Sequence, residues 1–219
     1  MSDKKPFFLV PERVISSDSS ASFQVSLLFC DIRGFTHLLE HLPAQEAYVF
    51  IESFLYTMAS VVVQEGGSVN NLTGDGFLAQ FGIGLNSDDH ALRAVNAAIR
   101  MRSKLTDINK ERHVRREPTI TMGIGIHSGV VAGGNVRLGA RRTFLLIGDS
   151  INLAARIEGL TKAFAVDILV SSQTYDLVKS QFQLLAMPSR VVKGKSESIL
   201  TYWIPPHAKV TRTYEKEAL

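Results

Sequence analysis

Apolar positions along this chain change their spacing from block to block, and the spacing predicts the first elements. The dense apolar run at 23–31 predicts a buried central strand. From 42 to 67 the apolar residues recur every three to four positions, which is typical of an amphipathic helix. Pro43 suits the first turn of that helix, and Gly66 with Gly67 predicts its end.

The rest of the pattern predicts alternating strands and helices. Two short apolar runs, 68–73 and 76–82, flank the turn Gly74-Asp75-Gly76 and predict a hairpin. Further along we expect a helix at 87–111 capped by Ser87 or Asp88, strands at 119–129, 130–134 and 142–148, a helix at 151–163 capped by Asp149 or Ser150, a strand at 167–171, a helix at 172–180, and a closing hairpin of 182–192 with 198–204.

This order predicts an α+β fold, a ferredoxin-like βαββαβ core with C-terminal additions. We expect a single domain at 22–206, between a flexible N-terminal arm at 1–21 and a flexible C-terminal tail at 207–219. The chain shows no internal repeat and no low-complexity tract.

Composition narrows the class of protein. Apolar residues make up 45% and charged residues 21% of the 219 positions, as in an ordinary soluble protein. Cys30 is the single cysteine, so no internal disulfide forms, and a reducing, cytoplasmic location is expected. No run approaches the length of a membrane span, and a net charge of +3 does not point to nucleic acid. We therefore expect neither a membrane nor a nucleic-acid partner.

Two aspartates carry the first chemical signal. Asp31 ends the buried strand at 23–31, and Asp75 lies at the tip of the hairpin. In a ferredoxin-like order these strands are neighbours, so the two carboxylates would meet and repel each other unless a divalent cation lay between them. Taken singly, Asp75 is more simply a turn residue and Asp31 a cap.

The combination with further motifs decides between these interpretations. In order along the chain stand FCDIRGFT, NLTGDGFLAQFG, GIGIHSGVVAGG, IGDSINLAARIE and VVKGK. These five blocks resemble the signature blocks of class III nucleotidyl cyclase catalytic domains over about 23–204. The resemblance implies a head-to-tail homodimer with two sites at its interface, which would cyclise a nucleoside triphosphate to a 3′,5′-cyclic nucleotide and release pyrophosphate.

The same resemblance implies roles for individual residues. Asp31, Asp75 and the Ile32 carbonyl would hold two divalent ions, Mn²⁺ or Mg²⁺. Asn152 would orient the ribose, and Arg156 would stabilise the transition state. It also implies phosphate contacts from Lys193 and from Arg141 or Arg142. Independently of the resemblance, the main-chain N–H groups of Ile32 to Thr36, which include Gly34 and Phe35, lead into a helix and could hold phosphate oxygens. The spacing of Asn152 and Arg156 agrees independently, since residues four apart share a helix face.

The positions that would recognise the base depart from the family pattern. Asn71 stands where adenylate cyclases of this family usually have lysine, and Leu145 stands where they have aspartate or threonine. An asparagine amide offers both a donor and an acceptor, which matches the edge of uracil, and leucine would shrink the pocket. Tyr48 could also face the base. We therefore expect a pyrimidine cyclase, with UTP favoured over CTP.

A stand-alone domain of this kind resembles the pyrimidine cyclases of bacterial anti-phage (Pycsar) systems, in which a separate effector reads the cyclic nucleotide. Two alternatives stay open at this stage. The chain could be an adenylate cyclase with unusual base contacts, or a catalytically silent cyclase-like module that only dimerises or binds nucleotide.

Overall fold

The computed structural model describes residues 20–34, 42–84, 88–138, 141–191 and 198–207, and at 138, 141 and 142 it describes the main chain alone. Nearly all of the expected arm and tail lie outside these residues. One sheet organises the rest. Its strands, in spatial order, are β2 (Ser68–Leu72), β3 (Gly76–Phe81), β1 (Ala21–Arg33), β4 (Thr121–Leu138), β6 (Ile168–Ser171), β10 (Thr201–Trp203) and β7 (Leu185–Ala186), with β5 (Arg141–Ile147) paired to β4.

The first four strands of the sheet follow the order 2-3-1-4, and all of their pairings are antiparallel. This is the βαββαβ arrangement that the sequence predicted. Beyond it, β6 adds to β4 in parallel, and β10 and β7 extend the edge. The two short strands β8 (Arg190–Val191) and β9 (Ser198–Ile199) pair only with each other.

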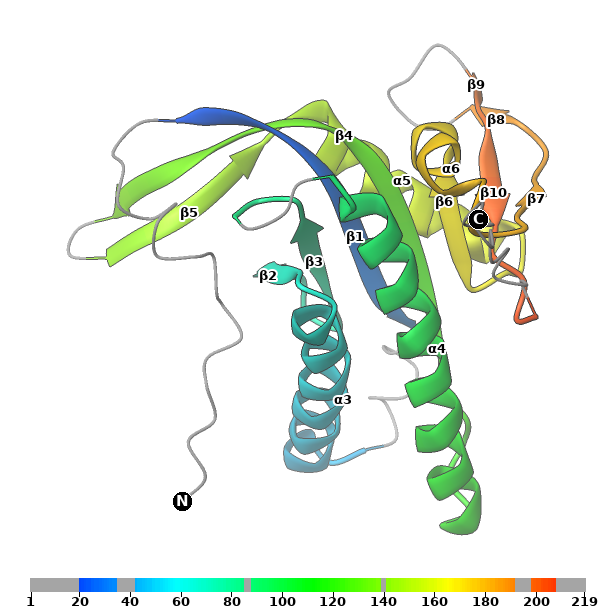
Figure 1. Ribbon diagram of the computed structural model, residues 1–219. Coiled ribbons are helices and arrows are strands. Elements are labelled where there is room, and N and C mark those ends of the chain that lie inside the picture. Colours follow the sequence, from blue (N-terminus) through cyan, green and yellow to red (C-terminus); the bar gives the residue numbers. More distant parts are fainter. Residues whose placement is uncertain (1–19, 35–41, 85–87, 139–140, 192–197, 208–219) are drawn as a thin grey trace, which may run out of the picture.

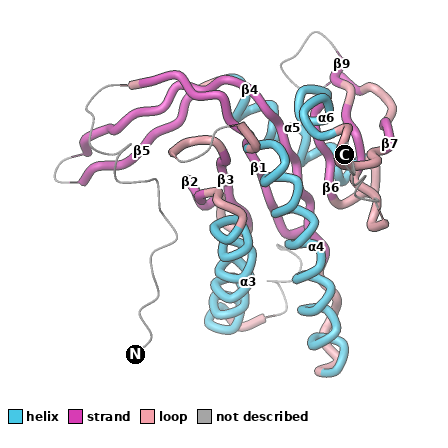
Figure 2. Tube along the Cα trace, in the orientation of Figure 1, coloured by secondary structure: helices cyan, strands magenta, loops and turns pink. Residues whose placement is uncertain are grey.

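Two long helices cover one face of the sheet. Helices α3 (Ala44–Gln64) and α4 (His90–Val114) lie side by side, whereas α5 (Asp149–Ala163) packs on the opposite face of β4 (Figure 1). The shorter α6 (Ser172–Val178) follows β6 and packs against α4 (Figure 2). β4 and β5 run on together as a long ribbon that projects beyond the helices.

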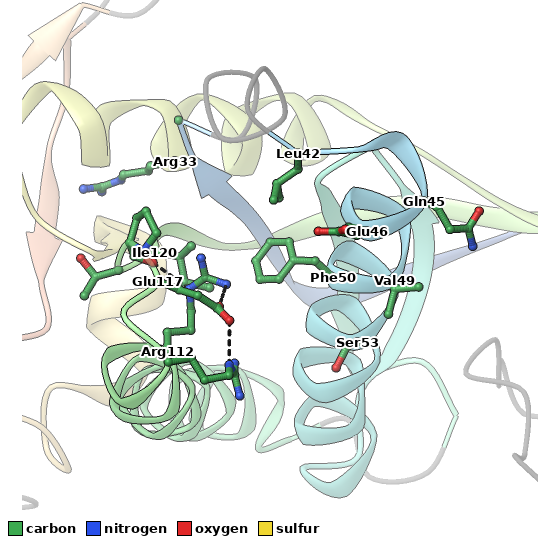
Figure 3. Close-up of a pocket in the computed structure, with 14 residues that line it drawn as sticks. Arg33, Leu42, Gln45, Glu46, Val49, Phe50, Ser53, Arg112, Glu117 and Ile120 are labelled. Carbon is green, nitrogen blue, oxygen red and sulfur yellow. Dashed lines mark hydrogen bonds and ion pairs between the residues drawn. The ribbon is translucent and has the colours of Figure 1, made fainter.

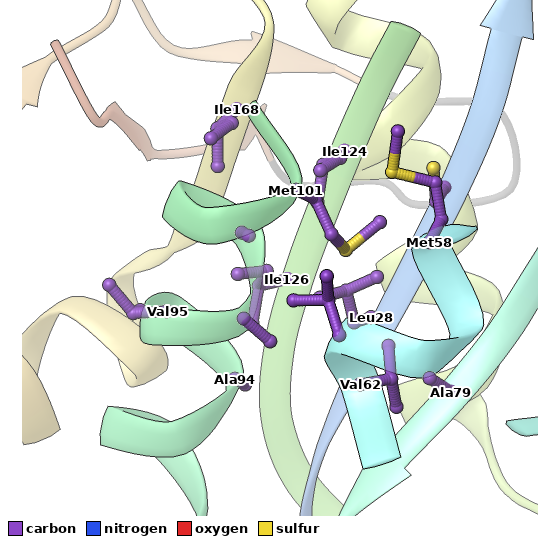
Figure 4. Packing of buried hydrophobic residues seen from close by; sticks show 14 of the residues in the cluster. Leu28, Met58, Val62, Ala79, Ala94, Val95, Met101, Ile124, Ile126 and Ile168 are labelled. Carbon is purple, nitrogen blue, oxygen red and sulfur yellow. The ribbon is translucent and has the colours of Figure 1, made fainter. Parts of the chain in front are cut away.

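Strand β1 is buried on both faces, which explains its unbroken apolar run. Leu28, Cys30 and Ile32 contribute to the large cluster under α3 and α4, whose packing Figure 4 shows around Met58, Met101 and Ile124. Their neighbours in the strand, Val25 and Leu27, point the other way into a smaller cluster with Leu78, Val131 and Ala154. Because successive strand residues alternate in direction, Asp31 lies on the α5 face.

Several element boundaries differ from those expected. The runs 119–129 and 130–134 form one continuous strand, β4, because Gly129 still pairs with Val25 and the ladder is not interrupted there. Helix α5 begins at Asp149, so its N-cap position is held by Gly148 and not by Asp149 or Ser150 as expected. Ser150 instead donates to the Val130 carbonyl, which ties the helix start to β4.

Other boundaries are confirmed. The N–H groups of Gly66 and Gly67 bond back to the carbonyls of Val63 and Val62, which ends α3 where the glycines predicted. By contrast, the expected start of α4 is wrong, because the N-cap is Asp89 and not Asp88, and the helix begins at His90; Ser87 lies outside the described residues. The helix continues three residues past the expected end. Among the described helices, only α3 is long and apolar enough to cross a membrane, and it packs Phe54, Met58 and Val62 into the core instead.

A partly buried ion pair fastens the C-terminal part to α4. Arg102 of α4 donates to both carboxylate oxygens of Asp167, at 2.5 and 2.9 Å, and to the carbonyls of Ile204 and Pro205. Trp203 donates its indole N–H to the same carboxylate at 3.1 Å. Although burial opposes it, this set of donors holds the pKa of Asp167 below its ordinary value.

Candidate active site

The hairpin tip brings Asp75 to the end of β1. Asp31 lies directly opposite Gly76 in the β1–β3 ladder, and Asp75 is the residue before Gly76. Burial, the charge of Asp75 and a hydrogen bond to it together raise the pKa of Asp31 from 3.8 to about 7, against a smaller opposing effect of the Ile32 N–H. The expected meeting of the two carboxylates is therefore found within a single chain.

Two glycines make this approach possible. Gly74 has a φ of +84°, and the Thr73 N–H closes the turn onto the Gly76 carbonyl at 2.9 Å. A Cβ placed on Gly76 would lie 2.2 Å from the Cys30 carbonyl oxygen and 2.9 Å from Asp31 Oδ1. Only glycine therefore allows the hairpin to lie this close to the end of β1.

The aspartate pair fits a divalent cation. Asp31 Oδ1 is buried and has no hydrogen-bond partner among the described residues. A bare buried carboxylate oxygen beside a second carboxylate is costly, and a cation with a preference for oxygen ligands would offset that cost. The described residues contain no cluster of three or more His, Cys, Asp or Glu placed to hold a metal, so the remaining ligands would come from the main chain, water or a substrate.

A third acidic residue, Glu158 of α5, interacts electrostatically with both aspartates although it is not placed to share a metal with them, and sequence reasoning missed it. Its pKa is raised, first by burial and further by the charge of Asp75, while Arg33 and a hydrogen bond with Thr161 act in the opposite direction. Glu158 in turn raises the pKa of Asp31. Its place in the block IGDSINLAARIE was visible in the sequence, but its distance along the chain from both aspartates hid the contact.

Glycines in β4 let α5 reach this position. A Cβ on Gly125 would lie 2.1 Å from the main-chain nitrogen of Glu158, and a Cβ on Gly123 would lie 2.3 Å from Glu158 Oε1. Gly123 is also the cross-strand partner of Asp31. The glycines of GIGIHSG therefore face α5, while Ile124 and Ile126 between them face the main core. The motif thus sets how close the helix lies to the aspartates.

Both Asn152 and Arg156 lie on α5. Asn152 precedes Glu158 by about one and two-thirds turns, and Arg156 precedes it by about half a turn. Asn152 is exposed, whereas Arg156 is half-buried and its Nη1 is buried without a hydrogen-bond partner among the described residues. Within the described part of one chain, no hydrogen bond or ion pair joins Arg156 to Asp31 or Asp75. A single chain therefore positions the two groups of residues separately.

The three residues expected at the base are not brought together in one chain. Asn71 pairs with Leu78 across the hairpin, and a bulge at Asn70 turns it onto the face of the sheet that carries Asp31. Leu145 is 44% exposed on the outer side of the β4–β5 ribbon, which is the side opposite to the packed residues Phe144 and Leu146. Tyr48 is 60% exposed on α3, which covers the opposite face of the sheet. The structure thus places Tyr48 away from the aspartates.

Comparisons with known proteins agree with this geometry. Residues 18–206 match the model of the adenylate and guanylate cyclase catalytic domain. The chain is 35% identical over 195 residues to an adenylate cyclase of Anabaena cylindrica, a match that covers 86% of this chain and 38% of that protein. The adenylyl cyclase CyaB of P. aeruginosa superposes with a TM-score of 0.78 at 26% identity, over 85% of this chain and 96% of that one. The guanylyl cyclase Cya2 gives 0.77 at 27% identity, over 90% and 97%.

This chain belongs to the adenylate and guanylate cyclase catalytic-domain family. Enzymes of this family, the class III nucleotidyl cyclases, generally depend on divalent metal ions, in line with the aspartate pair described above. The chain spans less than two fifths of the length of the curated relative from Anabaena.

The other expected residues of this cyclase domain are placed only in part. Gly34, with a φ of +68°, is exposed directly after β1. Ile32 lies in β1 with its side chain buried in the core. Arg141 and Arg142 belong to β5, where Arg142 pairs with Arg137 and Arg141 with Leu138. Phe35, Thr36 and Lys193 lie outside the described residues.

Proposed function

We propose that this domain converts a nucleoside triphosphate to a 3′,5′-cyclic nucleotide and pyrophosphate. The bond from the ribose 3′-oxygen to the α-phosphorus forms, the bond from that phosphorus to the bridging oxygen of pyrophosphate breaks, and the 3′-hydroxyl loses its proton. The observation that carries the proposal is the meeting of Asp31 and Asp75 at the end of β1, with α5, the helix that carries Asn152 and Arg156, packed on the same side of the sheet.

The residues of the chain would divide the work as follows. Asp31, Asp75 and the Ile32 carbonyl would hold two divalent ions, Mn²⁺ or Mg²⁺, which when bound lower the pKa of the 3′-hydroxyl and neutralise the triphosphate. Asn152 would orient the ribose, and the Arg156 guanidinium would neutralise charge that develops on the α-phosphate. Gly34, Phe35 and Thr36, together with Lys193 and Arg142, would contact the phosphates.

A second copy of the chain would complete the site. The outer side of the β4–β5 ribbon exposes apolar side chains, with Ile147 63%, Val130 56% and Leu145 44% exposed. A contiguous apolar row of this kind is typical of an interface. Because Arg156 does not reach the aspartates of its own chain, a head-to-tail homodimer would bring the Arg156 of one chain to the aspartates of the other, giving two sites per dimer.

Two candidates remain for the base. The similarity to the Anabaena relative favours ATP, because that protein is named an adenylate cyclase and is 35% identical over most of this chain. UTP, with CTP next, is favoured by Asn71 on the face that carries Asp31, because its short amide matches the donor and acceptor of uracil. The argument that Leu145 shrinks the base pocket depends on the dimer, since this side chain is exposed in a single chain.

Only a pyrimidine product would support a role in anti-phage signalling, in which a separate effector reads cUMP or cCMP in the cytoplasm. An adenine product would instead make the domain an adenylate cyclase with unusual base contacts. A chain that binds nucleotide and forms dimers without turnover would be a silent cyclase-like module.

One experiment separates these candidates. The purified protein is incubated with Mn²⁺ and ATP, GTP, CTP and UTP in separate reactions, and the products are identified by mass spectrometry. We expect one cyclic nucleotide to dominate, and the Asp75→Ala variant to lose about 10²-fold or more of the rate. Absence of any cyclic product from a folded dimer would refute catalysis, and dominance of cAMP would refute the pyrimidine candidate.

A further inference from the structure

Arg33, the last residue of β1, joins the strand that carries Asp31 to the connection between α5 and β6. Because strand residues alternate in direction and Ile32 points into the core under α3 and α4, Arg33 lies on the same face of the sheet as Asp31. Its Nη2 donates a hydrogen bond to the main-chain carbonyl of Val166, between α5 and β6. Arg33 also borders the cavity in Figure 3, but there its guanidinium points away from Phe50 of α3.

The acceptor of this bond lies in a turn that is held in place from several sides. The Val166 N–H bonds back to the Thr161 carbonyl of α5 at 3.0 Å. The next residue, Asp167, binds Arg102 of α4 through its side chain, and its main-chain carbonyl accepts an N–H of β4 at 2.7 Å. Because the turn is fixed without Arg33, the hydrogen bond from Arg33 restrains the end of β1.

The end of β1 needs such a restraint, because the sheet holds it on one side only. The ladder with β3 ends at Asp31, which pairs with Gly76. The ladder with β4 continues to Arg33, which pairs with Thr121. The last two residues of β1, Ile32 and Arg33, therefore have a strand neighbour on β4 alone. The bond to the α5–β6 connection supplies a second attachment where the sheet supplies none.

The charge of Arg33 also acts on Glu158. Glu158 is half-buried on α5, and its Oε1 lies 2.3 Å from the place where a Cβ on Gly123 would stand. Since Gly123 is the cross-strand partner of Asp31, Glu158 lies over the strand next to Asp31. Burial raises the pKa of Glu158, and the charge of Arg33 is the largest of the effects that lower it. Arg33 thus offsets a third negative charge near the aspartate pair.

We propose that Arg33 is a positioning residue of the cyclase site, which fixes the end of β1 to the α5–β6 connection. Through that attachment it holds Asp31 and the Ile32 carbonyl, the two groups of β1 assigned to the metal ions, in a fixed position. A residue that orients a metal ligand without touching the ion typically contributes about 10- to 100-fold to metal affinity or activity. The attachment of β1 stands on the geometry of one chain, whereas its effect on turnover rests on the proposed function.

Three variants separate a positioning role from a merely structural one. Arg33→Met removes the donor and the charge but keeps an aliphatic side chain. The double variant Arg33→Met with Glu158→Gln removes one charge of each sign, so the net charge of the site is unchanged and no carboxylate loses its counter-charge. Arg112→Met is the matched control. Arg112 also bonds a main-chain carbonyl, that of Pro118 at 2.7 Å, and a glutamate, but it lies on α4 at the opposite face of the sheet.

The attachment is tested without turnover, in the nucleotide-free protein. Hydrogen exchange followed by mass spectrometry should be about tenfold or more faster at residues 30–33 in both Arg33 variants, and should change by less than about twofold there in Arg112→Met. Mn²⁺ binding, measured by electron paramagnetic resonance, should weaken by about tenfold or more in the double variant, whose net charge equals that of the wild type. Unchanged exchange at 30–33 in both Arg33 variants would overturn the attachment. Unchanged Mn²⁺ affinity in the double variant would overturn the positioning of the metal ligands.

The effect on catalysis is tested by turnover in saturating Mn²⁺, at a temperature where circular dichroism shows that every variant is folded. We expect kcat to fall by about tenfold or more in both Arg33 variants, with the KM for the nucleotide within about threefold of the wild-type value. In Arg112→Met we expect a loss of stability, with kcat within about twofold of the wild-type value. Equal losses of kcat in Arg112→Met and in the Arg33 variants, or full turnover in the double variant, would overturn the positioning role. If the wild type cyclises no nucleotide, the proposed catalytic function fails and the exchange measurement alone decides the attachment.

Discussion

Asp31 lies opposite Gly76 in the β1–β3 ladder, and this pairing sets the distance between the two acidic residues of the site. The absence of a side chain at Gly76 lets the hairpin approach the Cys30 carbonyl, so that Asp75 lies next to Asp31. The geometry of the aspartate pair therefore depends on a glycine as much as on the carboxylates.

Gly76→Ala should both destabilise the protein and reduce turnover. The added Cβ would meet the Cys30 carbonyl at 2.2 Å, so β1 and the hairpin must separate. We expect a loss of about 1–3 kcal/mol in the free energy of unfolding, measured by urea denaturation. Gly159→Ala on α5, where a Cβ meets nothing within 4 Å, should instead add about 0.5–1 kcal/mol. A Gly76→Ala protein as stable as the wild type would contradict the close approach.

The stability of the metal-free protein should fall as the pH rises from about 4 to about 7. The pKa of Asp31 is near 7 in the folded state against an ordinary 3.8, so in this range the folded state holds a proton that the unfolded chain has lost. Stabilisation by this group is complete at low pH and is lost as the pH rises through 7. Urea denaturation in EDTA at several pH values measures the slope.

Two variants check the origin of that slope. Asp31→Asn should flatten it, because the titrating group is gone. Glu158→Gln should move it to lower pH, because the charge of Glu158 contributes to the raised pKa of Asp31. A slope that survives unchanged in Asp31→Asn would assign the titration to another residue.

Mixing two inactive variants should restore activity if each site is shared between chains. Asp75→Ala removes one acidic residue, and Arg156→Ala removes the guanidinium. In a head-to-tail arrangement, about half of the randomly formed dimers contain one chain of each variant, and each of these mixed dimers has one intact site out of two. About a quarter of the wild-type rate should therefore return. The rate is measured after the two variants are mixed and allowed to exchange partners. No recovery, with exchange demonstrated by mass spectrometry, would mean that each chain holds a complete site.

Asn71→Lys should change the preference among bases more than the best turnover. Asn71 faces the same side of the sheet as Asp31, so a longer cationic side chain would alter base contacts without displacing the aspartates. We expect the ratio of ATP to UTP turnover to shift by about tenfold. Leu72→Ala, the next residue, pairs with Phe77 and belongs to the opposite face, and should leave the ratio as it is. An unchanged ratio in Asn71→Lys would remove this residue from base recognition.

Asp167→Ala should destabilise the fold without a direct effect on the site. The change leaves the partly buried guanidinium of Arg102 without its carboxylate partner and the indole N–H of Trp203 without its acceptor. We expect a loss of about 2–4 kcal/mol, somewhat less than for a fully buried pair. Asp107→Ala breaks the exposed pair with Lys110 and should cost no more than about 0.5 kcal/mol. Equal stability of the two variants would refute the role of the Arg102–Asp167 pair.

The sequence alone predicted the order of strands and helices, the turn at Gly74 to Gly76 and the meeting of Asp31 with Asp75. These features depend on local periods and turn chemistry, which a short window of residues records, and on the pairing order that follows from them. The same local signals did not show that β4 runs without a break past Gly129, because ladder pairing with β1 decides that.

Only the tertiary structure decided what lies beside the aspartates. Glu158 joins them because Gly123 and Gly125 let α5 approach β4, a contact between segments more than thirty residues apart. Helix α3 packs its Phe54 and Met58 inward, so Tyr48 lies on the exposed side of the helix, on the face of the sheet opposite Asp31. Which neighbours a carboxylate meets follows from packing between distant segments, and no local pattern in the chain encodes that packing.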